Sequence, residues 1–69
     1  MNQSLKETLL LLDRSTALAV TGQFVKAHTV LNKVLESMPE GFSPPEFPGL
    51  YYYIEGRVVL LEALCESAK

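Results

Sequence analysis

The sequence has one imidazole and one thiol that could ligate a metal or act in catalysis, and they lie far apart along it. They are His28 and Cys65, the single histidine and the single cysteine. A metal site needs several His, Cys or carboxylate ligands at matched spacing, and a nucleophilic cysteine needs a base or cation beside it. No such spacing surrounds His28, and the neighbours of Cys65 in helical order include Leu61 and Glu62. We interpret both as structural residues and predict no metal site and no cofactor.

Three carboxylates near the C-terminal end point in one direction. At 100° per residue, Glu55, Glu62 and Glu66 form one narrow stripe of a helix. Such a cluster could serve acid–base or metal chemistry, but its partner groups would have to come from elsewhere. We interpret the stripe as a solvated face that keeps an apolar helix soluble. Lysines on another chain would make it a determinant of partner choice.

Two aromatic segments indicate contact with a partner or with the chain itself. Tyr51, Tyr52 and Tyr53 point about 100° apart, so they cannot all enter one core; an interface and simple packing at the rim both fit. The segment 45–48 has the P-x-x-P spacing of ligands for aromatic grooves. We expect the loop to pack both of its phenylalanines back over the helix ends, with the groove ligand as the alternative.

Composition and motifs exclude several functions. The chain has six Lys and Arg against eight Asp and Glu, a net charge of −2, so it lacks the clustered cations that bind nucleic acid. It shows no glycine-rich phosphate loop and no Ser/His/Asp arrangement. We therefore predict that the protein is not an enzyme and does not bind nucleic acid.

The sequence shows no pattern for export or membrane insertion. Its aliphatic runs are at most four residues long, far short of the roughly 20 apolar residues that span a bilayer. The first run, Leu9–Leu12, is bracketed by Glu7 and Asp13, unlike a signal peptide. A single cysteine cannot form an internal disulfide and indicates a reducing compartment. We expect a cytoplasmic protein without membrane insertion.

Helix-breaking residues divide the chain into three predicted helices. All four prolines lie within 39–48, and Gly22 separates two periodic segments upstream. The predicted elements are helices at about 4–21, 23–38 and 49–68, with a loop at 39–48. Residues 1–69 are therefore expected to form a single all-α domain, an antiparallel helix hairpin followed by a third helix.

The first two helices each show an apolar stripe at helical spacing. The first begins with a capping box of Ser4 and Glu7. Its stripe consists of Leu5, Leu9, Leu12, Thr16 and Ala19. The stripe of the second helix consists of Phe24, Ala27, Leu31, Val34, Leu35 and Met38. We expect the two stripes to pack against each other.

The third helix differs because it is apolar on nearly every side except along the glutamate stripe. Such a helix is buried on most sides, and two neighbouring helices in a chain of 69 residues cannot easily cover it. We therefore predict a partner interface on it. That interface consists of Tyr51, Tyr52, Tyr53, Val59, Leu60, Ala63 and Leu64.

Part of the chain, Leu11–Pro39, resembles a tetratricopeptide repeat, a helix–turn–helix unit of about 34 residues. The resemblance is carried by Gly22 at the turn, Phe24, Ala27 at the helix contact, Leu31, Val34, Leu35 and the closing Pro39. Ser15 takes the small contact position, whereas Leu11 and Arg14 depart from the Trp and Leu of the family. The first helix of a second repeat is matched by Tyr52, Gly56 and Val59. The resemblance implies about one and a half repeats.

Stacked repeats bury their core against neighbouring repeats, and about three are normally needed for stability. One and a half repeats therefore imply oligomerisation or docking onto a larger helical partner. In size, acidity and amphipathic helices the chain is also similar to the small export chaperones of bacterial secretion systems. We predict a non-enzymatic protein-interaction module, a small chaperone or adaptor subunit whose third helix covers an amphipathic helix of its partner. The alternative is a structural homo-oligomeric subunit with no client.

Overall fold

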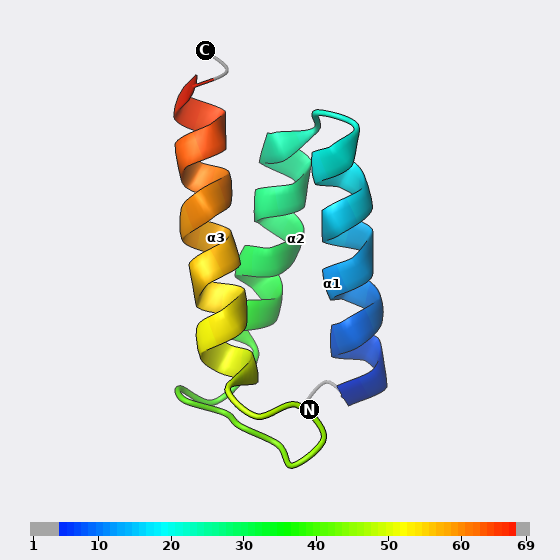
Figure 1. The fold of residues 1–69 in the computed structure, drawn as a ribbon, viewed down its shortest axis with the longest axis vertical. Helices are drawn as coiled ribbons and strands as arrows, with labels where there is room; N and C mark the ends of the chain where they lie inside the picture. Colours follow the sequence, from blue (N-terminus) through cyan, green and yellow to red (C-terminus); the bar gives the residue numbers. More distant parts are fainter. Residues whose placement is uncertain (1–4, 68–69) are drawn as a thin grey trace.

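Three α-helices make up the structure, a computed structural model that describes residues 5–67. They are α1 (Leu5–Val20), α2 (Phe24–Glu36) and α3 (Leu50–Ser67), and they run side by side with α2 between the other two (Figure 1). The predicted all-α fold, a helix hairpin followed by a third helix, is confirmed. The predicted capping residue Ser4 lies outside the described residues. No helix within 5–67 has the length and apolar character needed to cross a membrane.

The turn between α1 and α2 is a Schellman motif with glycine in the left-handed conformation. Gly22 has a φ of 81°, which a residue without a Cβ adopts at little cost. The Gln23 N–H donates to the Leu18 carbonyl at 2.9 Å, and the Gly22 N–H donates to the Ala19 carbonyl at 3.0 Å. These bonds satisfy carbonyls in the last turn of α1 and allow α2 to begin at once, so the two helices are antiparallel neighbours.

α1 and α2 approach each other through small side chains. The Ser15 hydroxyl donates to the Ala27 carbonyl at 3.0 Å, and both residues are 0 % exposed. Thr8, two turns earlier on the same side of α1, is also buried. Small residues allow the two helix backbones to come close, and the serine hydroxyl finds its partner at the contact itself.

The apolar stripe predicted for the first helix packs against the core only in part, because the fully buried positions of α1 are Thr8 and Ser15. Two members of that stripe, Leu9 and Thr16, are exposed, and the other three are half-buried beside the core. The helix is rotated so that Thr8 and Ser15 face α2. A pattern that counts apolar residues assigns small hydroxyl residues to solvent, although here they permit the closest packing.

The core is built around α2, which packs against both α1 and α3. Its buried hydrophobic members are Ala27, Leu31 and Val34 from α2 and Leu50, Ile54, Val58 and Leu61 from α3. All six residues of the stripe predicted for the second helix belong to this core or pack against it. α3 thus buries one side against α2 and leaves the opposite side uncovered within the chain.

The loop between α2 and α3 is held by its own hydrogen bonds. The Gly49 N–H donates to the Ser43 hydroxyl at 2.8 Å, and the Tyr51 N–H donates to the Phe42 carbonyl at 3.0 Å. Phe47 packs against the core and against the Tyr53 ring, with 5.5 Å between ring centroids. Phe47 therefore packs back over the start of α3, as expected, whereas Phe42 is 37 % exposed.

Replacement of Ala27 by leucine tests the close contact of α1 and α2. We expect Ala27→Leu to lower the free energy of unfolding by about 1–3 kcal/mol, because the added atoms have no space beside Ser15. Ala17→Leu, at an exposed position of α1, is the matched control and should change it by less than about 0.5 kcal/mol. Urea unfolding followed by circular dichroism measures both; equal stabilities of the two variants would contradict the close contact.

Candidate partner interface

The seven residues of the predicted interface point in several directions around α3. Tyr52, Tyr53, Val59 and Leu60 are 61 %, 46 %, 59 % and 51 % exposed. Ala63 is also exposed, whereas Tyr51 and Leu64 are half-buried. They divide into a side facing α1, a side facing away from the molecule and a side against the loop. Because the loop covers the third side, the uncovered part of α3 consists of two surfaces of different character.

The first surface is a groove between α1 and α3, floored by α2. It forms because α1 and α3 make far fewer contacts with each other than either makes with α2. The groove has a volume of about 290 Å³. Its lining residues are Thr16, Ala19, Val20, Phe24, Arg57, Leu60, Leu61 and Leu64. We call it the α1–α3 groove; of the seven predicted residues it contains Leu60 and Leu64.

Arg57 supplies the charge of the α1–α3 groove, and it is absent from the predicted interface. Its Nη2 donates to the Thr16 hydroxyl at 3.2 Å, which links α3 to α1 across the groove. Its Nε is screened from solvent and finds no hydrogen-bond acceptor among residues 5–67. An unpaired buried donor costs free energy, and a guanidinium binds carboxylates readily. A single arginine on an otherwise apolar side of the third helix is the sequence signal for this group.

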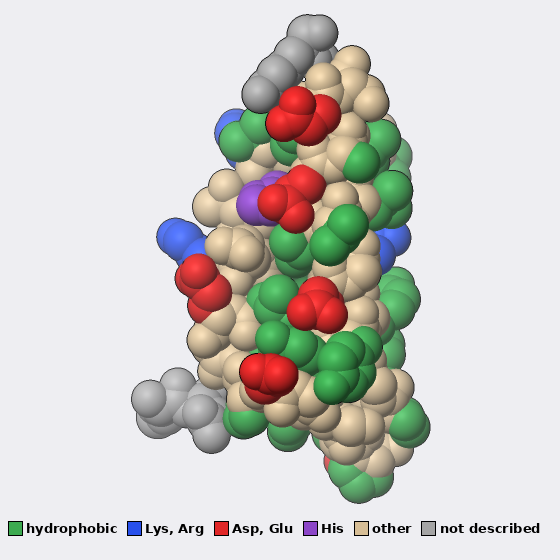
Figure 2. Space-filling model, turned by 90° about the vertical axis from the view of Figure 1, so that its left-hand side faces the viewer, with side chains coloured by type: hydrophobic (Ala, Val, Ile, Leu, Met, Phe, Trp, Pro, Cys, Tyr) green, Lys and Arg blue, Asp and Glu red, His purple; other side chains and the backbone are tan. Residues whose placement is uncertain are grey.

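The second surface is the side of α3 that faces away from α2, which we call the outer face. Its apolar members are Tyr52, Val59 and Ala63, and the glutamate stripe runs along one edge of it. Figure 2 shows this side of the molecule: acidic side chains run down it with hydrophobic ones between and beside them, and basic side chains appear only at the margins.

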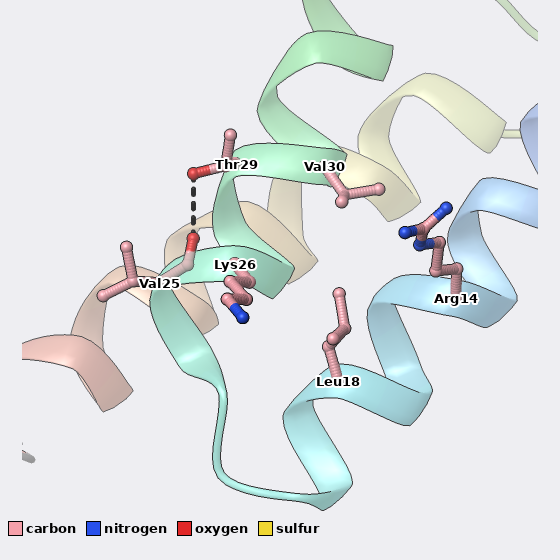
Figure 3. A pocket seen from close by; sticks show the side chains of 6 residues that line it. All are labelled: Arg14, Leu18, Val25, Lys26, Thr29 and Val30. Carbon is pink, nitrogen blue, oxygen red and sulfur yellow. Dashed lines mark hydrogen bonds between the residues drawn. The ribbon is translucent and has the colours of Figure 1, made fainter.

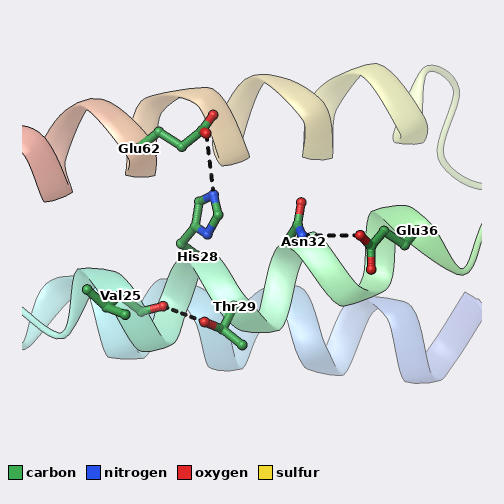
Figure 4. Close-up of polar contacts among 6 residues, drawn as sticks. All are labelled: Val25, His28, Thr29, Asn32, Glu36 and Glu62. Atoms are coloured by element: carbon green, nitrogen blue, oxygen red, sulfur yellow. Dashed lines mark hydrogen bonds and ion pairs between the residues drawn. The ribbon is translucent and has the colours of Figure 1, made fainter.

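One glutamate of the stripe also contacts the neighbouring helix. Glu62 Oε2 lies 3.8 Å from His28 Nε2 of α2 (Figure 4), so the acidic stripe is not entirely a solvated face. Cys65 and Glu66 line the same shallow pocket as this pair. The sequence does not bring these groups together because 34 positions separate the two partners. Within the described part of the chain, no three His, Cys, Asp or Glu side chains are placed to hold a metal ion.

A further surface lies between α1 and α2, on the side opposite the α1–α3 groove. It is a pocket of about 370 Å³ lined by Arg14, Leu18, Val25, Lys26, Thr29 and Val30, and we call it the basic pocket. Leu18 points between the side chains of Arg14 and Lys26 (Figure 3). Val25 is 70 % exposed. The basic pocket is not predicted from the sequence, since its two cations stand on different helices and neither belongs to a charge run.

Comparison with known proteins assigns the chain to no family. No family model, no curated protein and no solved structure matches it. The tetratricopeptide resemblance therefore stays a prediction, and the functional argument rests on the surfaces themselves.

The three tyrosines also have different surroundings. The Tyr51 and Tyr52 rings meet edge to face, with 5.5 Å between centroids, and the Tyr52 hydroxyl lies beside Gly41 of the loop. Partial removal of Tyr51 from water, followed by the negative charges of Glu55 and Glu40, raises the pKa of the Tyr51 hydroxyl. Tyr51 is therefore placed against the loop and its carboxylates, away from the α1–α3 groove.

A pH titration of tyrosinate absorbance tests this placement. We expect the last ionisation step above pH 10, the ordinary value for tyrosine, and Tyr51→Phe should remove it. Tyr53→Phe is the matched control and should leave the late step in place. Because the pKa of Tyr51 is higher in the folded chain than in the unfolded chain, its contribution to stability is constant below about pH 10 and falls above it. A late step that survives in Tyr51→Phe would refute the placement.

Proposed function

We propose that the protein is a non-enzymatic protein-interaction module that binds an amphipathic helix of a partner protein in the α1–α3 groove. The observation that carries this proposal is the groove itself: an apolar channel between two helices with one guanidinium in its wall. Exposed apolar surface of this kind, rimmed by polar residues, is typical of protein-binding sites.

The shape of the α1–α3 groove favours a helix as its occupant. The groove is lined by residues between Thr16 and Val20 of α1 and between Arg57 and Leu64 of α3, so its walls are about one turn of α1 and two turns of α3. A partner helix would pack beside both and place its apolar stripe on Val20, Leu60 and Leu64, in the manner of helix-in-groove recognition. Arg57 favours a partner with a carboxylate beside that stripe, because its guanidinium is a positive charge in an otherwise apolar wall and pairs readily with carboxylates.

A more specific role as a cytoplasmic chaperone or adaptor subunit belongs to the same proposal. Its support is the class-level similarity to small bacterial export chaperones and the tetratricopeptide-like pattern of the hairpin. A surface that covers an amphipathic helix suits such a role, since it would keep an aggregation-prone segment of a client away from water. We propose no nucleic-acid partner, because the net charge is −2.

Two labelled peptides test the α1–α3 groove. Both are amphipathic 18-residue helices (about the length of α3) with a leucine stripe, and one carries Glu beside the stripe where the other carries Lys. By fluorescence anisotropy we expect the Glu peptide to bind about tenfold more tightly, because it pairs with Arg57. Equal affinities of the two peptides would contradict the role of Arg57.

A matched pair of variants localises the binding. Leu60→Gln, in the groove, should weaken binding of both peptides by about tenfold or more, because it replaces a buried apolar contact with a polar group. Leu10→Gln, at a position of α1 that is 60 % exposed and does not line the groove, should leave the affinities unchanged. If neither peptide binds, or if the two variants behave alike, the proposed function is wrong.

A further inference from the structure

The outer face of α3 and the basic pocket have complementary chemistry. The outer face presents Tyr52, Val59 and Ala63, and its edge carries acidic side chains and no Lys or Arg within 50–67 other than Arg57, which faces α1. The basic pocket presents the apolar side chains of Leu18 and Val30 between two cations, with Val25 on the far side of Lys26. Each surface therefore has the apolar centre and the charge that the other one needs.

The acidic edge of the outer face is exposed to solvent. The side chain of Glu62 is 60 % exposed even though it lies 3.8 Å from His28, and Glu55 is exposed as well. On the basic side, Lys26 is exposed, and Lys33 follows it two turns later on α2. Asp13 is adjacent to Arg14 in sequence but lies about 100° away around α1, toward the groove side.

We propose that the outer face of α3 docks on the basic pocket of a second copy of this chain. The apolar contact joins Val59 and Tyr52 of one copy to Val25 and Leu18 of the next, and the glutamate stripe lies beside Arg14 and Lys26. Contact between unlike patches is heterologous, so each copy keeps one free outer face and one free basic pocket. The assembly therefore grows head to tail by addition of further copies.

A symmetric contact between two outer faces is disfavoured by charge. In an antiparallel pair of α3 helices related by a two-fold axis, the same flank of each helix meets its own copy, so the two glutamate stripes would face each other. In a parallel pair the stripe would lie against the other flank of α3, which carries Leu60 and Tyr53 and offers no cation. The basic pocket supplies the cations that both symmetric arrangements lack.

This inference does not rest on the α1–α3 groove, since neither docking surface includes Leu60 or the groove-facing part of Arg57. A chain can therefore bind its helical partner and a second copy at the same time. If the native chain binds the peptide but does not self-associate, only this inference is wrong. If it self-associates but does not bind the peptide, only the proposed function is wrong.

Two matched variants test the head-to-tail contact by sedimentation equilibrium. Val59→Gln disables the outer face, and Val25→Gln disables the basic pocket; both positions are exposed, so the core is untouched. The native chain should show a mass that rises with concentration between about 10 µM and 1 mM, the range for interfaces of modest area. Each variant alone should associate at least about tenfold more weakly.

An equimolar mixture of the two variants gives the decisive reading. The Val25→Gln chain keeps an intact outer face and the Val59→Gln chain keeps an intact basic pocket. The mixture should therefore form a 1:1 dimer with the native affinity and no larger species. Raising the salt concentration from about 0.1 M to about 1 M should weaken this dimer, because the Debye length falls from about 10 Å to about 3 Å. Circular dichroism melting curves verify that both variants are folded.

Three results would overturn the inference. The native chain could be monomeric over the whole concentration range, the two variants could associate as the native chain does, or the mixture could fail to restore a dimer that each variant has lost. The last result would indicate a symmetric contact in place of the heterologous one.

Discussion

Within residues 5–67 both α1 and α3 pack on α2, and this constraint determines most of the structure. A helix of 13 residues covers one side of α1 and one side of α3 and no more. The tight contact at Ser15 and Ala27 draws α1 close enough to α2 for the core to exclude water. Everything that α2 does not reach is left at the surface, including the outer face of α3 and the walls of the α1–α3 groove.

Much of the fold follows from local pattern, because breakers and periodicity act within a few residues. Gly22 and the four prolines separate the helices, and the apolar stripe of α2 matches the core it forms. The rotation of α1 about its axis does not follow from the apolar pattern, since it depends on which side chains are small enough to let the two backbones approach. Ser15 and Thr8 are polar, yet they are buried on the side of α1 that faces α2.

The candidate sites were less predictable than the fold because each joins side chains from different helices. The third helix shows surplus apolar surface in its sequence, and several predicted residues are indeed exposed on it. Its division into a groove side and an outer face needs the direction in which α3 meets α2. Arg57, the basic pocket and the contact of His28 with Glu62 all depend on neighbours 34 or more positions away, or on pairing across the hairpin.

The loop before α3 does more than connect two helices. Its hydrogen bonds from Gly49 to Ser43 and from Tyr51 to Phe42, with Phe47 packed beneath, hold the first turn of α3 at one rotational phase. Each residue added to or removed from a helix turns every later side chain by about 100°. A shift of one residue in this loop would bring Val59 or Leu60 toward α2 and turn core residues outward. The length of the loop therefore determines which side chains of α3 are exposed to solvent and to partners.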